Sequence, residues 1–430
     1  MNSEVIIRQD YRSSLRVGIC RNCSAPLHHT FVDLGMSPPC ESFVAPDMID
    51  SVEQYYPLHA FVCSECYLVQ LHEYVTPENI FEEYAYFSSY SDSWVAHAKQ
   101  YCDAIADRLN LGAESFVVEV ASNDGYLLQH LLERDIPLLG IEPAVNVAKA
   151  AIEKGIPTLT AFFGATLAKA MVAEGRQADL IVGNNVLAQV PDLNDFVAGL
   201  KILLKGAGVI TLEFPHIAKL IAENQLDTIY HEHFSYFSLL TIETLAARHG
   251  LIVFDVDELA THGGSLRVYL GHKEGPWARE AAVDALLDRE RAAGLGSLET
   301  YAAFGEAVRR TKRSLLSFLI GIKDKGMSIC AYGAPGKGNT LLNYCGIGTD
   351  FIDFAVDRNP YKHGRFTPGM HIPILPVDEI ARVRPDYVFI LPWNLKNEIV
   401  QQMKAIGDWG GKFIVPIPDV TVIDPRELAS

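Results

Sequence analysis

Four consecutive side chains in the middle of the chain, Tyr230, His231, Glu232 and His233, place a phenol, a carboxylate and two imidazoles on one short segment. Such groups can remove, carry and donate protons on a bound substrate, and clusters of titratable residues are a mark of active sites. A zinc protease site would need His-Glu-x-x-His, and here Ser235 stands where the second imidazole would have to be. The segment indicates acid–base chemistry, and the alternative is a polar cluster that only closes a turn.

A second set of reactive side chains consists of two C-x2-C pairs, Cys20 with Cys23 and Cys63 with Cys66. Each pair has the spacing of a zinc knuckle, in which a tight turn directs two thiolates at one tetrahedral ion, and two knuckles complete its shell. Disulfides are the alternative, but a chain without a secretion signal keeps its thiols reduced. Four thiolates leave no position for water, so we predict a structural zinc ion.

The other cysteines and the nearby histidines are less favoured as metal ligands. The spacing does not require a histidine ligand, although four histidines lie nearby and could replace a cysteine: His28, His29, His59 and His72. We interpret the remaining cysteines as ordinary buried thiols: Cys40, Cys102, Cys330 and Cys345.

Length and charge narrow the class of protein. A chain of 430 residues is too long for one ordinary core and suggests two or three domains. A net charge of -17 argues against a broad nucleic-acid surface, which needs a basic field on one face. No apolar run approaches the length of a membrane helix, and the first residues, MNSEVIIRQD, lack the apolar stretch of a signal peptide. We expect a cytoplasmic protein with no membrane or nucleic-acid partner.

The elements that must position these groups begin with two different blocks. Residues 1–80 are rich in turn formers and short on helical periodicity, which predicts a small β-rich lobe held by zinc. In residues 81–276 short apolar runs alternate with amphipathic segments, which predicts a parallel sheet covered on both faces. The strands expected there are 116–120, 138–142, 180–183 and 208–212, and the helices are 93–109, 126–132 and 145–152.

The third block, residues 277–430, begins with a charged, helix-favouring stretch that we interpret as a helical bridge. The stretch runs to Lys325 and is interrupted at Gly294-Leu295-Gly296. A second α/β pattern follows, with expected strands at 327–332, 352–356, 387–391 and 413–415. Two successive α/β blocks suggest two nucleotide-type sites.

The turn after the first expected strand of the central block has features of a cofactor loop. A loop for S-adenosylmethionine (SAM) usually has an acidic residue followed by alternating glycines; here Ala121 and Asn123 occupy two glycine positions and Gly125 remains. Glu142 ends the next strand, where a carboxylate can accept both ribose hydroxyls. A dinucleotide would need Gly-x-Gly-x-x-Gly, and Asp124 would repel its pyrophosphate. The loop favours the cationic cofactor, with a plain Asn-Asp-Gly turn as the alternative.

A strand-to-helix junction in the C-terminal block could hold phosphate. It runs from Tyr332 through Lys337 and Asn339, and it is not a P-loop because a glycine follows the lysine. A glycine-rich helix start with a lysine still predicts a phosphate cradle, and a plain tight turn is the alternative. Weaker candidates for binding the substrate are His262 and Arg267, and then a basic cluster that surface solvation explains equally well: Arg358, Lys362 and Arg365.

Taken together, these motifs resemble the bacterial SAM-dependent sugar C-methyltransferases, in order and over nearly the whole chain. The motifs are the two knuckles, the loop 118–125, Tyr230-x-Glu232-His233-Phe234, His262-Gly263-Gly264 and Ala331-Tyr332-Gly333-Ala334. The resemblance implies an α/β protein with a zinc-binding domain at 1–80 and a central Rossmann-like SAM domain at 81–276. The rest, 277–430, would be the helical bridge and a second Rossmann-like domain that holds the nucleotide-sugar. The implied reaction is methylation of carbon 3 of a nucleotide-linked 4-keto-deoxysugar.

The resemblance also assigns roles to residues. Tyr230, Glu232 and His233 match the active-site segment, with His233 as the base, and Tyr86 falls where the family has another active-site tyrosine. A segment from Asn185 to Gln189 is expected at the cofactor, but glutamine stands where the family can carry histidine. Glutamine cannot accept a proton, so it would act by hydrogen bonding. His231 also differs, since an acidic residue can occur there.

The chemistry implied by these residues is the formation of a carbon nucleophile. A ketone beside the reacting carbon lets His233 remove a proton, while Tyr230 and Tyr86 can donate to the enolate oxygen and Glu232 can orient the base. Two other classes stay open. One is an NAD(P)-dependent oxidoreductase of a nucleotide-sugar, and the other is a non-catalytic module that binds zinc and SAM.

Overall fold

The computed structural model of the chain describes residues 18–76 and 87–429. We refer to residues 18–76 as the N-terminal lobe, to 87–276 as the central domain and to 277–429 as the C-terminal domain. The expected α/β fold with a small N-terminal lobe is confirmed. Tyr86, one of the expected active-site residues, lies outside the described part of the chain.

The N-terminal lobe is built from short antiparallel strands. Its strands are β1 (Gly18–Ile19), β2 (Pro26–Leu27), β3 (His29–Ser37), β4 (Tyr56–Val62) and β5 (Val69–Leu71), and a short 3-10 helix, η1, covers Pro46–Met48. In β4 every second side chain is buried, namely Leu58, Ala60 and Val62, as expected of a strand with one face on a core. The central domain adds a fourth strand, β11 (Ser235–Tyr236), at the edge beside β5. The lobe is thereby joined to the segment that carries Tyr230 to His233.

A seven-stranded mixed sheet forms the central domain, in the order β12-β13-β10-β9-β6-β7-β8. Its strands are β6 (Val117–Val120), β7 (Leu138–Ile141), β8 (Thr158–Leu159), β9 (Ala178–Asn184), β10 (Leu204–Pro215), β12 (Leu251–Leu259) and β13 (Ser265–His272). Strands β8 to β10 pair in parallel through β7, β6 and β9, but β13 runs antiparallel to β10 and β12 antiparallel to β13. The four expected strands pair in parallel, and β12 and β13 are two further strands that the sequence analysis did not predict. The short connection 260–264 joins these two strands as an antiparallel pair.

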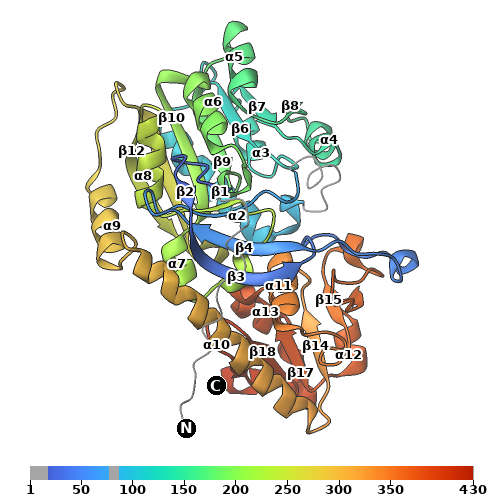
Figure 1. Cartoon of the computed structure of the whole chain (residues 1–430). Helices are drawn as coiled ribbons and strands as arrows, with labels where there is room; N and C mark the ends of the chain where they lie inside the picture. Colours follow the sequence, from blue (N-terminus) through green and yellow to red (C-terminus); the bar gives the residue numbers. More distant parts are fainter. Residues whose placement is uncertain (1–17, 77–86, 430) are drawn as a thin grey trace, which may run out of the picture.

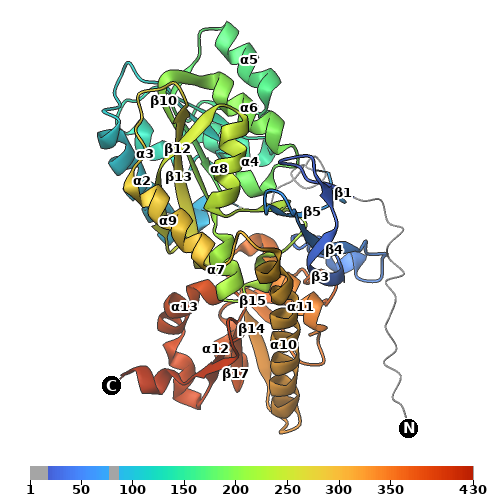
Figure 2. The same cartoon turned by 60° about the vertical axis from the view of Figure 1, so that its left-hand side comes forward.

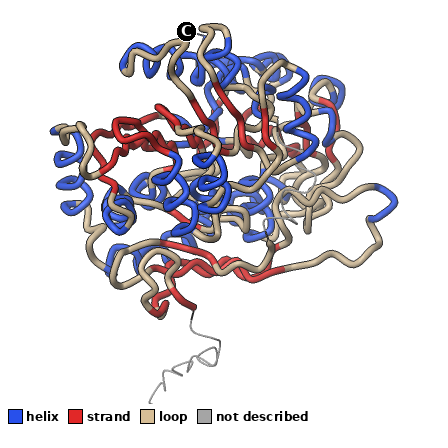
Figure 3. The backbone as a smooth tube through the Cα atoms, turned by 90° about the horizontal axis from the view of Figure 1, so that it is seen from above, coloured by secondary structure: helices blue, strands red, loops and turns tan. Residues whose placement is uncertain are grey.

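Helices cover both faces of this sheet, as Figure 3 shows from above. They are α2 (Asp92–Arg108), α3 (Leu128–Leu132), α4 (Val145–Glu153), α5 (Ala165–Ala173), α6 (Leu193–Leu203) and α8 (Leu239–Arg248). Helix α7 (Ile217–Ala222) packs instead in the core that the N-terminal lobe shares with the C-terminal domain. Short 3-10 turns supply the loops near the site: η2 (Ser88–Tyr90), η3 (Leu187–Gln189), η4 (Leu226–Thr228) and η5 (Thr261–Gly263). All four residues of β6 are buried, which is typical of a central strand covered on both sides.

The C-terminal domain follows two helices, α9 (Ala281–Ala292) and the 26-residue α10 (Leu298–Lys323). Its sheet has the order β16-β15-β14-β17-β18-β19, parallel except for β19. The strands are β14 (Ile329–Tyr332), β15 (Ala355–Asp357), β16 (Ile374–Pro376), β17 (Tyr387–Ile390), β18 (Lys412–Val415) and β19 (Thr421–Ile423), and the helices α11 (Gly336–Cys345), α12 (Glu379–Val383) and α13 (Lys396–Gln402). Further 3-10 turns are η6 (Pro360–Lys362), η7 (Trp393–Leu395), η8 (Lys404–Trp409) and η9 (Pro425–Ala429). The strand expected from 352 begins only at Ala355, because the preceding residues form a turn on the Gly348 carbonyl.

The N-terminal lobe lies where the two larger domains meet, as the blue strands β3 and β4 show in Figures 1 and 2. One side of its sheet packs on the C-terminal domain, where Phe31 stacks on Phe304 of α10 with ring centroids 4.5 Å apart. The zinc-binding cysteines and Leu68 share a core with the central domain instead. A ligand site at this junction can therefore draw side chains from all three parts. Among the helices of the described chain, none, α10 included, has the length and apolar character needed to cross a bilayer.

Candidate active site and metal centre

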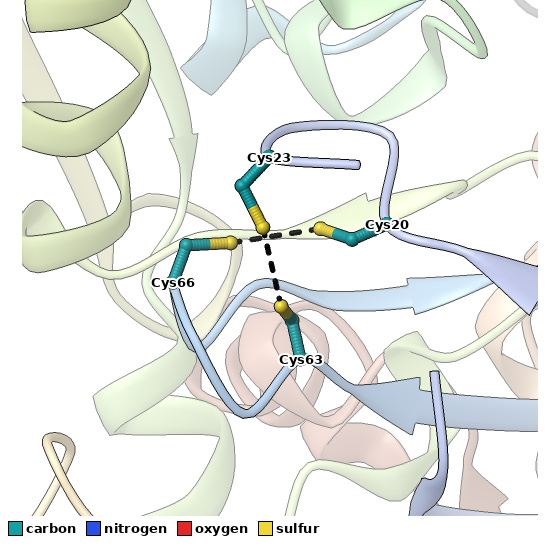
Figure 4. Close-up of side chains that lie close together, drawn as sticks. All are labelled: Cys20, Cys23, Cys63 and Cys66. Carbon is teal, nitrogen blue, oxygen red and sulfur yellow. Dashed lines mark hydrogen bonds between the residues drawn. The ribbon is translucent and has the colours of Figure 1, made fainter. Parts of the chain in front are cut away.

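The four knuckle cysteines converge on one point (Figure 4). Their sulfur atoms all lie within 4.8 Å of one another, with Cys20 Sγ 3.6 Å from Cys66 Sγ and Cys23 Sγ 3.4 Å from Cys63 Sγ. A zinc ion with Zn–S bonds of about 2.3 Å needs sulfurs roughly 3.8 Å apart, so the four thiols fit a tetrahedral ion. All four are free thiols, and within the described chain no histidine joins the set.

The two knuckles repeat the same backbone geometry. The N–H of Cys20 donates to the carbonyl of Ala25 at 2.8 Å, and the N–H of Cys63 donates to that of Leu68 at 3.0 Å. Each knuckle also has one non-glycine residue in the left-handed region, Ser24 at φ 67° and Tyr67 at φ 57°. The two thiolate pairs are thus prearranged in matching turns, as a structural site requires.

The metal centre is connected to the segment that carries Tyr230 to His233. Gln70 Nε2 donates to Cys20 Sγ at 3.2 Å, and the same residue pairs with Ser235 between β5 and β11. Arg21, inside the first knuckle, places its guanidinium 5.3 Å from the ring centre of Phe234. A group that hydrogen-bonds to a metal ligand fixes the orientation of that ligand. Through Gln70 and Arg21 the metal site is therefore in contact with Phe234 and Ser235, at the edge of the candidate active site.

A cavity of about 520 Å³ opens where the three parts of the chain meet. This volume is in the range of small-molecule sites. The residues that line it come from every part of the chain: Cys40 and Glu41 from the N-terminal lobe; Trp94, Ala121, Asn123, Glu142, Asn185, Gln189, Tyr230, Glu232, His233 and His262 from the central domain; and Gly336, Lys337, Lys362 and Asn394 from the C-terminal domain. Most of the predicted site residues are brought together here.

The predicted cofactor loop keeps the backbone path of a glycine-rich turn. Ala121, Asn123 and Gly125 have φ values of 57°, 50° and 77°, so two residues with side chains adopt the conformation that glycine usually supplies. At Gly125 the positive φ favours glycine, and the end of the Ile156 side chain would have to move for a Cβ atom, which would lie 2.2 Å from its Cδ1. Ala121 and Asn123 line the cavity, whereas Gly125 and Asp124 do not. Asp124 is buried in an ion pair with Lys154 at 3.2 Å and shapes the loop from behind.

Glu142 lies at the end of β7 with its carboxylate on the cavity. Its two oxygens accept from the backbone N–H of Asn123 at 3.0 Å and of Ala144 at 2.9 Å. Burial raises the pKa of Glu142, and these two donors oppose the shift. Each carboxylate oxygen keeps a lone pair for a ribose hydroxyl, and the amides of Asn185 and Gln189 lie on the same wall. The carboxylate acceptor and the two amides fit the ribose and the polar groups of SAM.

Tyr230 and His233 form a hydrogen-bonded pair on the cavity wall. His233 Nδ1 lies 3.2 Å from the carbonyl oxygen of Thr228, which can only accept, so Nδ1 carries the proton. Nε2 must then accept, and the Tyr230 hydroxyl donates to it at 2.9 Å. Burial lowers the pKa of His233 to about 3, so the imidazole is neutral. A neutral imidazole can accept a proton, so His233 is in the protonation state of a base.

Glu232 has the opposite electrostatic setting. Burial, followed by the charge of Glu41, raises the pKa of Glu232 to about 8, so its carboxyl group is mostly protonated at neutral pH. Its Oε1 accepts from the thiol of Cys40 at 3.6 Å. Neighbouring groups with pKa values pushed apart are the usual sign of an acid and a base. His231 does not line the cavity and packs edge-on against Tyr56.

Of Tyr332, Lys337 and Asn339 in the expected phosphate cradle, Lys337 lines the cavity and the other two do not. Its ammonium group donates to Asn394 Oδ1 at 3.0 Å and lies 5.0 Å from the ring centre of Trp393. Asn339 instead donates to the carbonyl of Cys40 at 2.7 Å, and Tyr332 places its hydroxyl 3.5 Å from Gln402 Oε1. These two residues fix the walls of the site from outside.

The two candidate substrate-binding residues that follow β12, His262 and Arg267, have different positions. His262 lines the cavity at φ 55°, with its ring edge-on to Trp94 at 4.9 Å. Arg267 is buried behind it in an ion pair with Glu213 and over the ring of Tyr101, so it does not reach the cavity. Arg267 stabilises the end of the sheet, and its guanidinium group does not line the cavity.

Sequence reasoning missed several residues of the cavity: Cys40, Glu41, Ser88, Trp94 and Asn394. Cys40, interpreted as an ordinary buried thiol, is buried but contacts Glu232. Lys362, considered part of a solvated surface cluster, is only 8% exposed and lines the cavity. No sequence signal marks these five residues: four lie in turns or 3-10 helices, Trp94 is one apolar residue of helix α2, and only tertiary packing brings them to the site.

Comparisons with known proteins agree with this architecture. Three family models match: a zinc binding domain at residues 20–81, a methyltransferase domain at 94–256 and a C-methyltransferase C-terminal domain at 260–418. The C-methyltransferase NovU of Streptomyces niveus is 33% identical over 404 residues, which are 94% of this chain and 96% of that protein.

Solved structures of other methyltransferases are more distant. The magnesium protoporphyrin IX methyltransferase of Synechocystis PCC 6803, with bound SAM, is 16% identical with a TM-score of 0.32, over 42% of this chain and 82% of that one. A SAM-dependent methyltransferase from Anabaena variabilis is 16% identical with a TM-score of 0.35, over 42% and 86% of the two chains.

Proposed function

The chain belongs to the SAM-dependent sugar C-methyltransferases, and on that premise we propose that it methylates carbon 3 of a nucleotide-linked 4-keto-deoxysugar through an enolate. The enzyme uses SAM as its cofactor and zinc as a structural metal. The observation that carries the proposal is one cavity in which Glu142, the Tyr230–His233 pair and Lys337 face a common space. A ribose acceptor, a base and a cation are the groups that such a reaction needs together.

The charges around the cavity suggest how two substrates lie in it. Among the described residues that line the cavity, those of the central domain include the carboxyl groups of Glu142, Asp192 and Asp195 and no lysine or arginine, whereas both lining lysines belong to the C-terminal domain. A cationic cofactor is favoured on the first wall and an anionic diphosphate on the second, at Lys337, because Lys362 is paired with Glu41. The sugar would then lie between them, beside Tyr230, Glu232 and His233.

In the proposed reaction His233 removes the proton from carbon 3. Its neutral Nε2 accepts the proton, and the two electrons of the broken C–H bond pass into the enolate, whose charge lies on the oxygen at carbon 4. The imidazolium keeps its Nδ1–H bond to Thr228. The Tyr230 hydroxyl, released from Nε2 as that nitrogen takes the proton, can turn to the enolate oxygen.

Glu232 would act as a neutral hydrogen-bond donor. A protonated carboxyl group that stays neutral in a buried site can stabilise an enolate oxygen, and such donors act most strongly where charge develops. Cys40 already donates to Oε1, which leaves the proton on Oε2 for the substrate. This refines the expected role of Glu232 from orienting the base to holding the enolate.

SAM supplies an electrophilic methyl group on a cationic sulfur. The chain's own contribution to this step is placement, because Glu142 fixes the ribose and the 230–233 segment fixes the sugar across one cavity. With SAM bound, the enolate carbon would form the new C–C bond as the sulfur–methyl bond breaks and neutral S-adenosylhomocysteine leaves, and His233 would then return its proton to solvent.

Solvent deuterium exchange tests the proposal without a methyl donor. The enzyme should exchange the carbon 3 proton of a nucleotide-4-keto-6-deoxyhexose in D2O, and mass spectrometry should then find one added methyl group when SAM is supplied. Absence of both reactions over a panel of such sugars would reject this substrate class.

A further inference from the structure

The inference concerns Glu41, a residue of the N-terminal lobe that reaches the cavity. Its carboxylate Oε2 lies 3.4 Å from Nζ of Lys362, and the backbone N–H of Gly336 also hydrogen-bonds to it. Lys362 is held in turn by the carbonyl of Ala334 at 2.8 Å. The Glu41 side chain keeps 23% of its exposure, and both charged residues line the cavity.

The charges of this pair support each other. Burial raises the pKa of Glu41, and the neighbouring lysine and the Gly336 N–H oppose that shift. Burial lowers the pKa of Lys362, but Glu41 and Asp357 more than offset it, so the net shift is upward. The net shift of the Glu41 pKa is upward, and the geometry sets its carboxyl group against the Lys362 ammonium group as an ion pair.

Glu41 occupies the place where a phosphate would otherwise be expected. Gly336 is the first residue of the ten-residue helix α11, and a helix start beside a lysine is an anion site. The approach is so close that a Cβ atom on Gly336 would lie 3.0 Å from Glu41 Oε1 and 2.8 Å from Cys40 Sγ. A protein carboxylate thus takes the N-terminus of α11 and neutralises Lys362.

The other cavity lysine is in a different state. Lys337 donates to a neutral amide, that of Asn394, and lies over the ring of Trp393. Within the described residues no carboxylate forms an ion pair with it, and Asp227 acts on its pKa only as a more distant charge. A diphosphate therefore meets an unpaired cation at Lys337 and a neutralised one at Lys362.

Glu41 also lies near Glu232, one of the residues proposed to face the sugar. The preceding residue, Cys40, contacts Glu232 at 3.6 Å, and the charge of Glu41 acts on Glu232 directly. A carboxylate has about four acceptor sites, of which Lys362 and Gly336 take two. The remaining capacity is open to a hydroxyl or amino group on the ring that carries the reacting carbon.

We propose that Glu41 is a specificity-determining residue of the methyl transfer, one that accepts a hydrogen bond from a hydroxyl or amino substituent at carbon 2 of the sugar and excludes phosphate from the start of α11. The sugar half of this statement rests on the proposed function, and the phosphate half does not. Since Glu41 and Gly336 come from different parts of the chain, the N-terminal lobe takes a direct part in choosing the substrate.

The first arm of the test compares two substrates that differ only in a hydroxyl group at carbon 2. Glu41→Ala should lower kcat/KM about 10–100-fold for thymidine diphosphate-linked 4-keto-6-deoxyglucose, the loss expected for a hydrogen bond to a charged group, and change it little for the 2-deoxy sugar. Glu41→Gln should lie between, because it keeps an acceptor without the charge. Asp47→Asn, an exposed acidic residue of the same lobe, is the matched control and should leave both rates unchanged. Equal losses on both sugars would reduce Glu41 to a helix cap and overturn the sugar half.

The second arm is calorimetric titration with inorganic phosphate. Native enzyme should show no phosphate binding at Lys362, whereas Glu41→Ala should gain a phosphate site that is lost again in Glu41→Ala with Lys362→Met. If the native enzyme and Glu41→Ala bind phosphate alike, the exclusion is wrong. If the native enzyme methylates neither sugar, the proposed function fails. The phosphate titration still shows whether Glu41 excludes phosphate from the start of α11.

Discussion

Replacement of Glu232 by glutamine separates a neutral donor from a carboxylate base. The pKa of Glu232 is raised to about 8, chiefly by burial, so the protonated form persists to a pH above neutrality. If that form is the active one, the rate is full below about pH 8 and falls as the pH rises through this value. Glutamine cannot ionise and keeps a donor in the same place, so Glu232→Gln should lose the alkaline limb of the profile.

The size of the effect follows from the same pKa. With a value of about 8, roughly ten in eleven molecules are protonated at pH 7 and roughly one in eleven at pH 9, so the native rate should fall about tenfold between them. Glu232→Ala removes the donor altogether, which for groups that stabilise a developing oxyanion costs about 10²–10³-fold in kcat. Glu232→Gln should keep a rate well above that of the alanine variant and show a flat profile to pH 9.

The assay is the initial rate of methyl transfer under saturating SAM from pH 6.5 to 9.5. Glu174→Gln, an exposed acidic residue of the same domain, is the control for a general change in charge, and thermal melting of each variant checks that the fold is kept. A glutamine variant as inactive as the alanine one, with a native rate that rises with pH, would mean that Glu232 works as a carboxylate base and would refute the reasoning.

Three other outcomes are expected. Chelation of zinc, or the double substitution Cys20→Ser with Cys63→Ser, should abolish activity, and elemental analysis should then find no zinc. The reason is that the zinc ligand Cys20 is hydrogen-bonded to Gln70, which pairs with the strand that follows His233. Full activity in a zinc-free sample would contradict this. Glu142→Ala should weaken SAM binding on the order of 10–100-fold by calorimetry, because two charge-assisted hydrogen bonds are lost, and tight NAD binding with unaltered SAM binding would favour the oxidoreductase. His233→Ala should abolish methyl transfer and deuterium exchange with SAM affinity nearly unchanged; exchange retained there and lost in Tyr230→Phe would move the base role to the phenol.

Local patterns were sufficient to predict much of the fold. Thiol spacing predicted the four-cysteine cluster, because a knuckle is a property of five or six consecutive residues. The buried run 117–120 and the turn at Gly125 were visible for the same reason, since a parallel strand and a left-handed residue leave local signals. The antiparallel pair β12 and β13 was missed, and with it the burial of Arg267.

The substrate side of the cavity could be predicted only in part. Glu41 and Lys362 are more than three hundred positions apart, and their ion pair depends on how the N-terminal lobe packs on the C-terminal domain. A sequence pattern cannot report such a pairing, because each residue in its own segment is an ordinary turn residue. The same holds for Cys40, whose contact with Glu232 follows from tertiary packing alone.

The most direct test of the central claim is the position of the methyl group in the product. Native enzyme would be incubated with SAM carrying a 13C-labelled methyl group and a nucleotide-linked 4-keto-6-deoxyhexose, and the isolated product examined by mass spectrometry and NMR. The account predicts one labelled methyl group bonded to carbon 3, with the ketone at carbon 4 retained. A label on oxygen or nitrogen, or an unchanged sugar over the whole panel, would contradict it.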